Sequence, residues 1–321
     1  MQNLLTTVNE IFAAEQFVRE PVRLYEPIDY TLRLGGKRIR PVMLLAANRM
    51  FGGSLDTVRH AAIGIEVFHN FTLLHDDLMD RSPLRRGQPT VYRKWDENTA
   101  ILSGDTMFAL AWRYFLVQPH HRLQEILQCF NQTAIEVCEG QQYDMNFETA
   151  DHVTVDDYMM MIRLKTAVLL AGALKIGALY ADAPAADIDH LYQFGIHLGL
   201  AFQLQDDLLD AYGDTATFGK QTGQDIRDNK KTYLYLQALQ HADPAQQAEL
   251  RSLFSSTPAD SDDKVSHVLA IYHQLGIRRQ VEDSIQHQFL LAQQHLDAIR
   301  VDDSQKTPLR QLMDTLFDRK K

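Results

Sequence analysis

The sequence lacks several features that would each point to a particular class of protein. It has only two cysteines, Cys129 and Cys138, which cannot form a disulfide framework and lack the spacing of a zinc site. We therefore expect a reducing, cytoplasmic environment. The net charge is −10, from 42 acidic and 32 basic residues, so no overall basic field would attract nucleic acid. Nucleic acid is not an expected partner.

Long apolar segments are also scarce. The most apolar stretch, Ala167–Ala181, is interrupted by Lys175 and is too short to cross a bilayer, so we expect a buried core helix there. Residues 1–16 are amphipathic and acidic, which argues against a signal peptide. The sequence predicts no membrane span.

Alternating runs of β-branched residues are missing as well, which argues against β-sheet. Apolar residues instead recur at helical spacing, for example over residues 4–12 and 281–292. The most linker-like segment, Ser255–Asp263, is short for a connection between domains. The pattern predicts one all-α domain over residues 1–321, built from roughly ten or more helices.

Two acidic clusters of the same pattern stand out from this apolar background. LHDDLMD at Leu74–Asp80 returns as LQDDLLD at Leu204–Asp210. Residues three and four apart share a helix face, so the carboxylates of each cluster repel one another unless a cation screens them. Oxygen ligands without cysteine are typical of Mg²⁺. The repetition favours metal binding over a solvated acidic helix end, and it predicts these ligands: Asp76, Asp77, Asp80, Asp206, Asp207 and Asp210.

Basic residues accompany the first cluster. Lys37 and Arg40 precede the apolar segment Val42–Met50, at an expected helix N-terminus where backbone N–H groups favour an anion. Arg85 and Arg86 follow the cluster and can bind phosphate in a bidentate manner. Each pair alone could be a surface charge run, but together and beside a metal cluster they predict phosphate binding.

Basic residues also follow the second cluster. The glycine-rich stretch FGKQTGQD at 218–225 contains Lys220, and Asn229-Lys230-Lys231-Thr232 comes directly after it. A glycine-rich loop is a weak signal by itself. Beside a metal cluster it favours phosphate coordination.

These motifs occur in a fixed order: GGKRIRP at 35–41, His69 with LLHDDLMDRSPLRRGQPT, SGD at 103–105, Gly140-Gln141, Lys165-Thr166, FQLQDDLLD and FGKQTGQDIRDNKKT. In these motifs and their order the chain resembles the trans-isoprenyl diphosphate synthases of the polyprenyl synthetase family, over about residues 35–232. The resemblance implies an all-α homodimer of the isoprenoid synthase type, with helices around a deep central cavity. It also implies Mg²⁺-dependent head-to-tail condensation of isopentenyl diphosphate with an allylic diphosphate (dimethylallyl, geranyl or farnesyl).

Carried over by position, the resemblance assigns two Mg²⁺ ions to Asp76, Asp77 and Asp80, and a third to Asp206 with Asp207 and Asp210 nearby. It assigns the allylic diphosphate to Arg85, Lys165, Lys220 and Lys230. It assigns isopentenyl diphosphate to Lys37, Arg40, His69 and Arg86. Lys165, Thr166 and Gln203 are the expected catalytic residues around the reacting centre.

Two positions depart from the family pattern. Tyr92 stands where a histidine is common, and Asn229 replaces a usual glycine. The second change is mild, because asparagine tolerates the left-handed backbone conformation. Neither departure changes the expected reaction class.

Product length is expected to depend on the helix that bears the first cluster. Phe71 lies five residues before Asp76, about 7.5 Å along the helix, and Phe68 is one turn deeper. The resemblance makes Phe71 a cavity floor, whereas Phe68 could equally be core packing. Thr72 is small where an aromatic residue typically accompanies a C15 product. We therefore expect geranylgeranyl diphosphate (C20), with farnesyl diphosphate (C15) as the alternative.

Other readings of these motifs remain. A class I terpene cyclase would lack the second DDxxD cluster and GGKRIRP, and a squalene-type synthase would show different acidic motifs. A non-catalytic subunit of a prenyl synthase usually loses part of a cluster, and this chain keeps both. The C-terminal Arg319-Lys320-Lys321 could close over the diphosphates, but a solvated tail is the simpler expectation. The sequence does not identify the preferred allylic starter or the pathway served.

Overall fold

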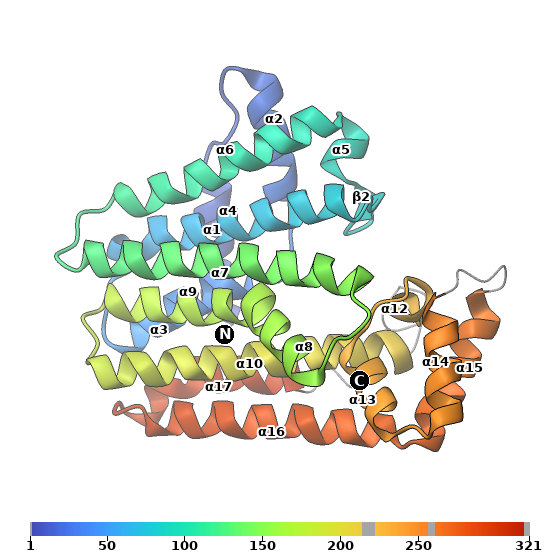
Figure 1. Cartoon of the computed structure of the whole chain (residues 1–321). Coiled ribbons are helices and arrows are strands. Elements are labelled where there is room, and N and C mark those ends of the chain that lie inside the picture. Colours follow the sequence, from blue (N-terminus) through green and yellow to red (C-terminus); the bar gives the residue numbers. More distant parts are fainter. Residues whose placement is uncertain (1, 214–221, 256–260, 318–321) are drawn as a thin grey trace. The chain divides into compact units, whose positions relative to one another are not determined.

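The computed structural model describes residues 2–213, 222–255 and 261–317 (Figure 1). The structure is 80% helical, which confirms the all-α class. No described helix combines the length and apolar character needed to span a membrane. The chain separates into two compact units, Met1–Asn131 with Gly172–Leu191 and Arg300–Gln311, and Gln132–Ala171 with Tyr192–Ile299 and Leu312–Lys321. The single domain over 1–321 stays a prediction.

The first unit begins with helices and one short hairpin. These elements are α1 (Gln2–Ala14), α2 (Val22–Arg33), α3 (Ile39–Met50), α4 (Leu55–Met79), β1 (Leu84–Arg85), β2 (Gln88–Pro89), α5 (Val91–Lys94) and α6 (Glu97–Leu116). Helix α4 packs along α6 and against α3, and α2 also packs on α6. Gly64 of α4 makes this close approach possible, because a Cβ there would lie 3.0 Å from the Ala111 carbonyl oxygen of α6.

Four helices contribute residues to both units: α7 (Leu123–Thr149), α9 (Val168–Leu179), α10 (Ala185–Tyr212) and α17 (Asp303–Phe317). The apolar stretch Ala167–Ala181 forms most of α9 and is largely buried, as expected. Helix α10 carries the second acidic cluster near its end, and α4 carries the first cluster at its C-terminus.

The second unit contains the remaining elements: α8 (Val155–Ile162), a π-helical turn (Arg163–Ala167), α12 (Gln224–Arg227), α13 (Tyr233–His241), α14 (Pro244–Ser255), α15 (Ser261–Gln274) and α16 (Ile277–Ala298). Helix α13 packs against α8, α14, α15 and α16, and the buried faces of these helices supply the core of the unit.

Two local details differ from the sequence expectation. Helix α3 begins at Ile39 rather than Val42, so Pro41 sits in its first turn. The hairpin β1–β2 was not expected, because four residues of strand leave no alternating pattern to detect. Its turn uses Arg86 and Gly87, with φ of 53° and 75°, and glycine is the residue that favours this conformation.

A close contact positions the π-helical turn. Gly140 of α7 faces it so closely that a Cβ at position 140 would lie 2.3 Å from the Lys165 backbone nitrogen. The turn carries Lys165 and Thr166, two of the expected catalytic residues. The short distance explains why a side chain at position 140 would displace this part of the chain.

Replacing Gly140 by Ala should therefore lower the free energy of unfolding by about 1–3 kcal/mol, because overpacking outweighs the gain in helix propensity. Urea denaturation of the purified variant measures this change. Glu139→Ala, at the exposed neighbouring position, is the control and should stay within about 0.5 kcal/mol of wild type. Equal stability of the two variants would contradict the role given to the contact.

Candidate active site

The first acidic cluster divides into two kinds of carboxylate. Asp77 is buried and accepts hydrogen bonds from Arg85, with Nη2 at 2.6 Å and Nε at 3.0 Å from its Oδ1. Asp76 is half-buried and Asp80 is exposed, and they lie four residues apart on one helix face. Burial raises the pKa of Asp77, and Arg85 opposes this shift. A carboxylate buried at a helix C-terminus is therefore stabilised here by a cation.

A set of basic side chains lies near this cluster in the first unit. Arg40 Nη1 lies 3.0 Å from Nε2 of His69. The Arg86 guanidinium covers Gly36, where a Cβ would lie 2.6 Å from Nη2 of Arg86. Gly36 has a φ of 128°, which side-chain-bearing residues rarely adopt. The GGKRIRP motif therefore leaves space for an arginine that comes from the β1–β2 turn.

Glu66 is the buried carboxylate within this basic set. Its Oε1 accepts a hydrogen bond from Arg38 Nη1 at 3.0 Å, and Asn70 Nδ2 lies 3.2 Å from the same oxygen. Arg38 also donates to the Leu32 carbonyl and lies over the Phe12 ring, 4.3 Å from its centroid. The Arg38 and Glu66 side chains are 6% and 2% exposed, so this ion pair is shielded from water.

Guanidinium groups outnumber carboxylates in the basic set around Glu66. Among the described residues, Arg38, Arg40, Arg85 and Arg86 interact with one another and with the two carboxylates Glu66 and Asp77. The pKa of Arg40 is lowered to about 10, mainly by burial; Glu66 opposes this shift and Arg86 adds to it. Burial and Arg40 hold the pKa of His69 well below its usual range, so its ring is neutral at pH 7.

Arg40 also has a buried donor that lacks a partner. Its Nε is enclosed and forms no hydrogen bond within the protein. A buried, unsatisfied donor costs free energy, and an anionic ligand with several acceptor oxygens would relieve that cost. Lys37 is exposed just before this set, in the same motif. The arrangement therefore fits a polyanion held by guanidinium groups.

An aromatic cluster lies along α4 below the acidic residues. The Phe71 ring is 5.4 Å from Phe108 of α6 and 5.5 Å from Phe68, and the Phe68 ring is 5.3 Å from Phe130 of α7. Phe68 is fully buried, whereas Phe71 and Thr72 are half-buried. Phe71 therefore forms the more accessible end of the cluster. Sequence reasoning missed Phe108, because its neighbours come from another helix.

The second acidic cluster repeats the division seen in the first. Asp207 is buried and accepts a 2.5 Å hydrogen bond from the Tyr158 hydroxyl of α8 and a 3.2 Å bond from Gln203 Nε2. Gln203 in turn accepts from the Thr166 hydroxyl at 3.2 Å. Burial and Asp225 raise the pKa of Asp207 well above its usual range. Asp206 and Asp210, one turn apart, are both half-buried.

Asp225 belongs with this cluster, although sequence reasoning did not select it. Its backbone N–H donates to Asp210 Oδ2 at 3.0 Å. Burial, and next the nearby Asp210, raise the pKa of Asp225 to about 6. Lys230 Nζ lies 3.7 Å from Asp225 Oδ1. The expected motif FGKQTGQD ends at this residue, so its proximity to the cluster could have been suspected.

Adjacent lysines have different environments. Lys231 Nζ donates to the carbonyls of Phe147 and Ala150 at the end of α7, at 2.8 and 2.6 Å. Lys230 is exposed and lies beside Asp225. Asn229 has a φ of 59°, as expected for a residue in a glycine position, and its side chain accepts from the buried Lys264. Lys231 therefore anchors the loop that carries Lys230.

Two further predicted residues complete the description. Lys165 Nζ forms a 2.6 Å ion pair with Asp144 of α7. Lys220 lies outside the described residues. The first unit thus brings together Lys37, Arg40, His69, Arg85, Arg86 and the first acidic cluster with Phe68, Phe71 and Thr72. The second unit holds Lys165, Thr166, Gln203, Lys230 and the second acidic cluster.

A helical fold with two DDxxD clusters and a separate set of guanidinium groups is characteristic of the isoprenoid synthase class. The comparisons agree with this class. The chain belongs to the polyprenyl synthetase family, whose model matches residues 21–272. The family expected from the sequence is confirmed.

Individual relatives are similar over most of their length. The chain is 40% identical over 274 residues to the geranylfarnesyl diphosphate synthase of Natronomonas pharaonis, covering 79% of each chain. It is 40% identical over 226 residues to the geranylgeranyl diphosphate synthase of Methanosarcina mazei, covering 70% of this chain and 69% of the relative. A crystal structure of a geranylgeranyl pyrophosphate synthase matches with a TM-score of 0.95 and 42% identity, over 100% of this chain and 99% of that one.

The buried ion pair gives a direct test of the site's electrostatics. Glu66→Gln should lower the free energy of unfolding by about 3–5 kcal/mol, because it leaves the Arg38 guanidinium buried without its counter-ion. Urea denaturation measures the loss. Glu97→Gln, which removes the partner of Arg81 in an exposed ion pair, is the matched control and should cost less than about 1 kcal/mol. Similar losses in both variants would contradict the importance of burial here.

Proposed function

We propose that this chain catalyses the Mg²⁺-dependent head-to-tail condensation of isopentenyl diphosphate with an allylic diphosphate. The observation that carries the proposal is the presence of two chemically different groups of side chains, each suited to a diphosphate in its own way. One kind is acidic and needs divalent metal, at the Asp-rich clusters. The other is the basic set around Glu66, in which guanidinium groups outnumber carboxylates and Arg40 has an unsatisfied donor. A reaction that joins two diphosphate substrates requires both.

The acidic residues fit Mg²⁺ by their chemistry. The donors are carboxylate oxygens, and burial disfavours the charged forms of Asp77 and Asp207 in the absence of a cation. In the proposal, Asp76, Asp77 and Asp80 hold two ions and Asp206 and Asp210 a third, with Asp207 as the buried support of that helix end. When bound, Mg²⁺ would neutralise charge on the departing diphosphate.

The chain's own residues would act by positioning. Arg85, Lys165, Lys220 and Lys230 are assigned to the allylic diphosphate, and Lys37, Arg40, His69 and Arg86 to isopentenyl diphosphate. The allylic C1–O bond breaks and the C4 carbon of isopentenyl diphosphate bonds to C1. The proton lost from C2 goes to the released diphosphate. The neutral ring of His69 can accept from Arg40 and so orient that guanidinium toward the anion.

Thr166 and Gln203 are assigned to the reacting centre. Their mutual hydrogen bond, and the bond from Gln203 to Asp207, fix the Gln203 amide in one orientation. A fixed amide dipole stabilises developing positive charge without reorganisation during the reaction. The chemistry needs no nucleophilic side chain.

We propose geranylgeranyl diphosphate as the product. Phe71, packed on Phe108 and Phe68, would end the space available to the growing chain. The two relatives at 40% identity are named for different product lengths, so identity alone does not decide between them. The aromatic cluster favours geranylgeranyl diphosphate, the shorter of the two products.

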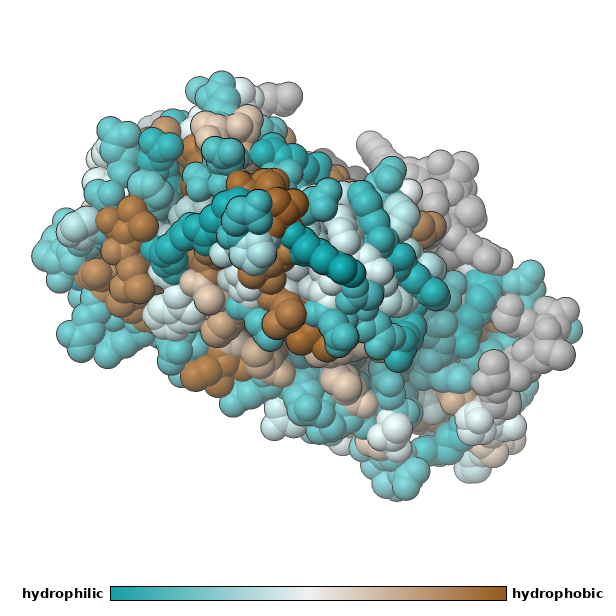
Figure 2. Space-filling model, turned by 90° about the horizontal axis from the view of Figure 1, so that it is seen from above, coloured by the Kyte–Doolittle hydropathy of each residue, from teal (hydrophilic) through white to brown (hydrophobic). Residues whose placement is uncertain are grey.

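A homodimer in the cytoplasm is the proposed state of the enzyme. Helix α6 exposes Ile101 and Leu102 by 43% and 58%, and Leu116 at its end by 56%. Figure 2 shows apolar surface (brown) among the hydrophilic side chains on the face seen from above. Adjacent exposed apolar side chains such as Ile101 and Leu102 are a feature of interaction surfaces, and they support the dimer proposal. Two cysteines, too few for a disulfide framework, support a reducing compartment.

The proposal is tested with purified protein, Mg²⁺, isopentenyl diphosphate and each of the C5, C10 and C15 allylic diphosphates. We expect diphosphate release and a C20 prenyl diphosphate by chromatography, and no turnover when a chelator removes Mg²⁺. A cyclised hydrocarbon formed without isopentenyl diphosphate would indicate a terpene cyclase instead. No condensation with any starter, and no cyclised product, would contradict the proposal and favour a non-catalytic subunit.

Phe71→Ala should lengthen the product by at least one C5 unit, because it removes the ring that closes the aromatic cluster. Chromatographic sizing of the products measures the change, and Phe108→Ala should act in the same direction. Phe254→Ala is the control: this buried ring packs on Tyr235 in α13, so its loss should destabilise the fold but leave product length unchanged. If neither Phe71→Ala nor Phe108→Ala changed the product length, these rings would not form the floor of the cavity for the growing chain.

A further inference from the structure

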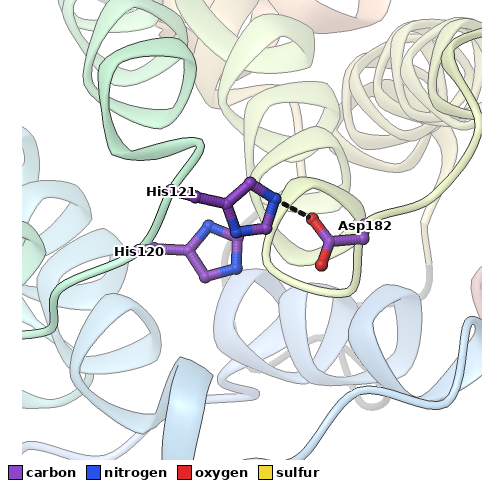
Figure 3. A group of neighbouring side chains, drawn as sticks. All are labelled: His120, His121 and Asp182. Carbon is purple, nitrogen blue, oxygen red and sulfur yellow. Dashed lines mark ion pairs between the residues drawn. The ribbon is translucent and has the colours of Figure 1, made fainter.

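Another group of possible metal ligands lies in the first unit, far from the first acidic cluster. His120 and His121 belong to the connection between α6 and α7, and Asp182 to the connection between α9 and α10. One possible ligand atom from each of the three side chains lies within 4.8 Å of the other two. Figure 3 shows both rings and the carboxylate gathered at one point. None of these residues has a part in the proposed reaction.

The cluster lies at the opposite end of α4 from Asp77. Gly64, in the first half of α4, contacts Ala111 and Phe115 near the end of α6. Residues 64 and 77 are thirteen positions apart, which is about 20 Å along a helix. His120 comes four residues after α6 ends. The two sites are therefore separate.

The local contacts already hold the three side chains together. His121 Nε2 lies 2.9 Å from Asp182 Oδ1, and the His120 ring stacks on His121 with centroids 4.5 Å apart. The His120 and Tyr180 rings pack edge to face, with their centroids 5.2 Å apart. Arg122 Nη1 donates to the Ala183 carbonyl at 3.3 Å, which ties the two connections to each other.

The spacing is close to that of a metal centre. Ligand atoms about 2.0 Å from a tetrahedral ion lie about 3.3 Å apart, so small side-chain shifts would suffice here. Two imidazoles and one carboxylate favour a borderline ion of the Zn²⁺ type over Mg²⁺, which prefers oxygen alone. Three protein ligands leave a fourth position for water.

Binding would also have a cost. The Arg122 backbone N–H donates to His120 Nδ1 at 3.2 Å. Coordination through either nitrogen of His120 gives up this long hydrogen bond, and the ion replaces the contact between His121 and Asp182. The free energy gained from the metal–ligand bonds must exceed the free energy lost with these two contacts.

We propose that His120, His121 and Asp182 bind a divalent transition metal ion of the Zn²⁺ type, which links the α6–α7 and α9–α10 connections. The ion would stabilise the fold and would differ in chemistry and location from the Mg²⁺ of the reaction. The same chain would thus sort two kinds of metal by ligand type.

The test uses the full-length protein, stripped of metal with a chelator and titrated with Co²⁺ in excess Mg²⁺. Mg²⁺ saturates the aspartate clusters, and Co²⁺ bound by imidazole gives a visible absorption band. We expect one saturable band in the wild type, with binding weakened more than about tenfold in His121→Ala and in Asp182→Asn. His273→Ala, an exposed histidine of α15, is the control and should keep the band.

Two further measurements separate this site from the active site. Zn²⁺ should raise the melting temperature of the wild type but not of His121→Ala. Prenyl transfer by His121→Ala in Mg²⁺ should equal that of the wild type. Equal Co²⁺ spectra and affinities in the wild type and His121→Ala, or no Co²⁺ band in the wild type when Mg²⁺ is in excess, would overturn the proposal.

Discussion

Burial of opposite charges in the first unit organises the candidate active site. Glu66, on α4, pairs with Arg38, from the GGKRIRP motif, where neither side chain meets much water. Taking both charges out of water is costly, so the pair is retained only with good geometry and added hydrogen bonds. Asn70, Leu32 and Phe12 supply those contacts. The pair fixes the loop that carries Lys37 and leads into Arg40 at the start of α3, and the positive charge of Arg40 and Arg86 is what a second diphosphate would neutralise.

The two acidic clusters share a spatial arrangement that their sequences do not reveal. In each, the second aspartate is buried against a partner, Arg85 for Asp77 and Tyr158 for Asp207. In each, the first and last aspartates are four residues apart and less buried. The buried carboxylates hold the helix ends in place and so orient the less buried pairs. Each cluster therefore combines one fixed carboxylate with two that are more accessible.

Much of the site was predictable, because helical spacing and residue chemistry act locally. The paired clusters, the basic residues beside them and the all-helical fold follow from the sequence pattern alone. The family resemblance then placed single residues such as Thr166 and Gln203, which no local pattern selects. Asn229 behaves as expected for a glycine position, with a φ of 59°.

The rest depends on contacts between distant segments. Tyr158 lies 49 residues from Asp207 in the sequence, and Phe108 lies 37 residues from Phe71. No local sequence pattern therefore indicates that either pair is in contact. Lys230 and Lys231 are adjacent and chemically alike, and only the carbonyls at the end of α7 distinguish them. The β1–β2 turn was missed because an arginine at positive φ is rare and is stabilised by its surroundings.

The central claim is that one diphosphate site depends on guanidinium groups and the other on metal. Calorimetric titration of the metal-free protein in a chelator tests this most directly, with isopentenyl diphosphate and with a non-reactive allylic diphosphate analogue. The account predicts that isopentenyl diphosphate binds without metal and that the allylic analogue binds only after Mg²⁺ is restored. An equal dependence of both ligands on Mg²⁺ would contradict it.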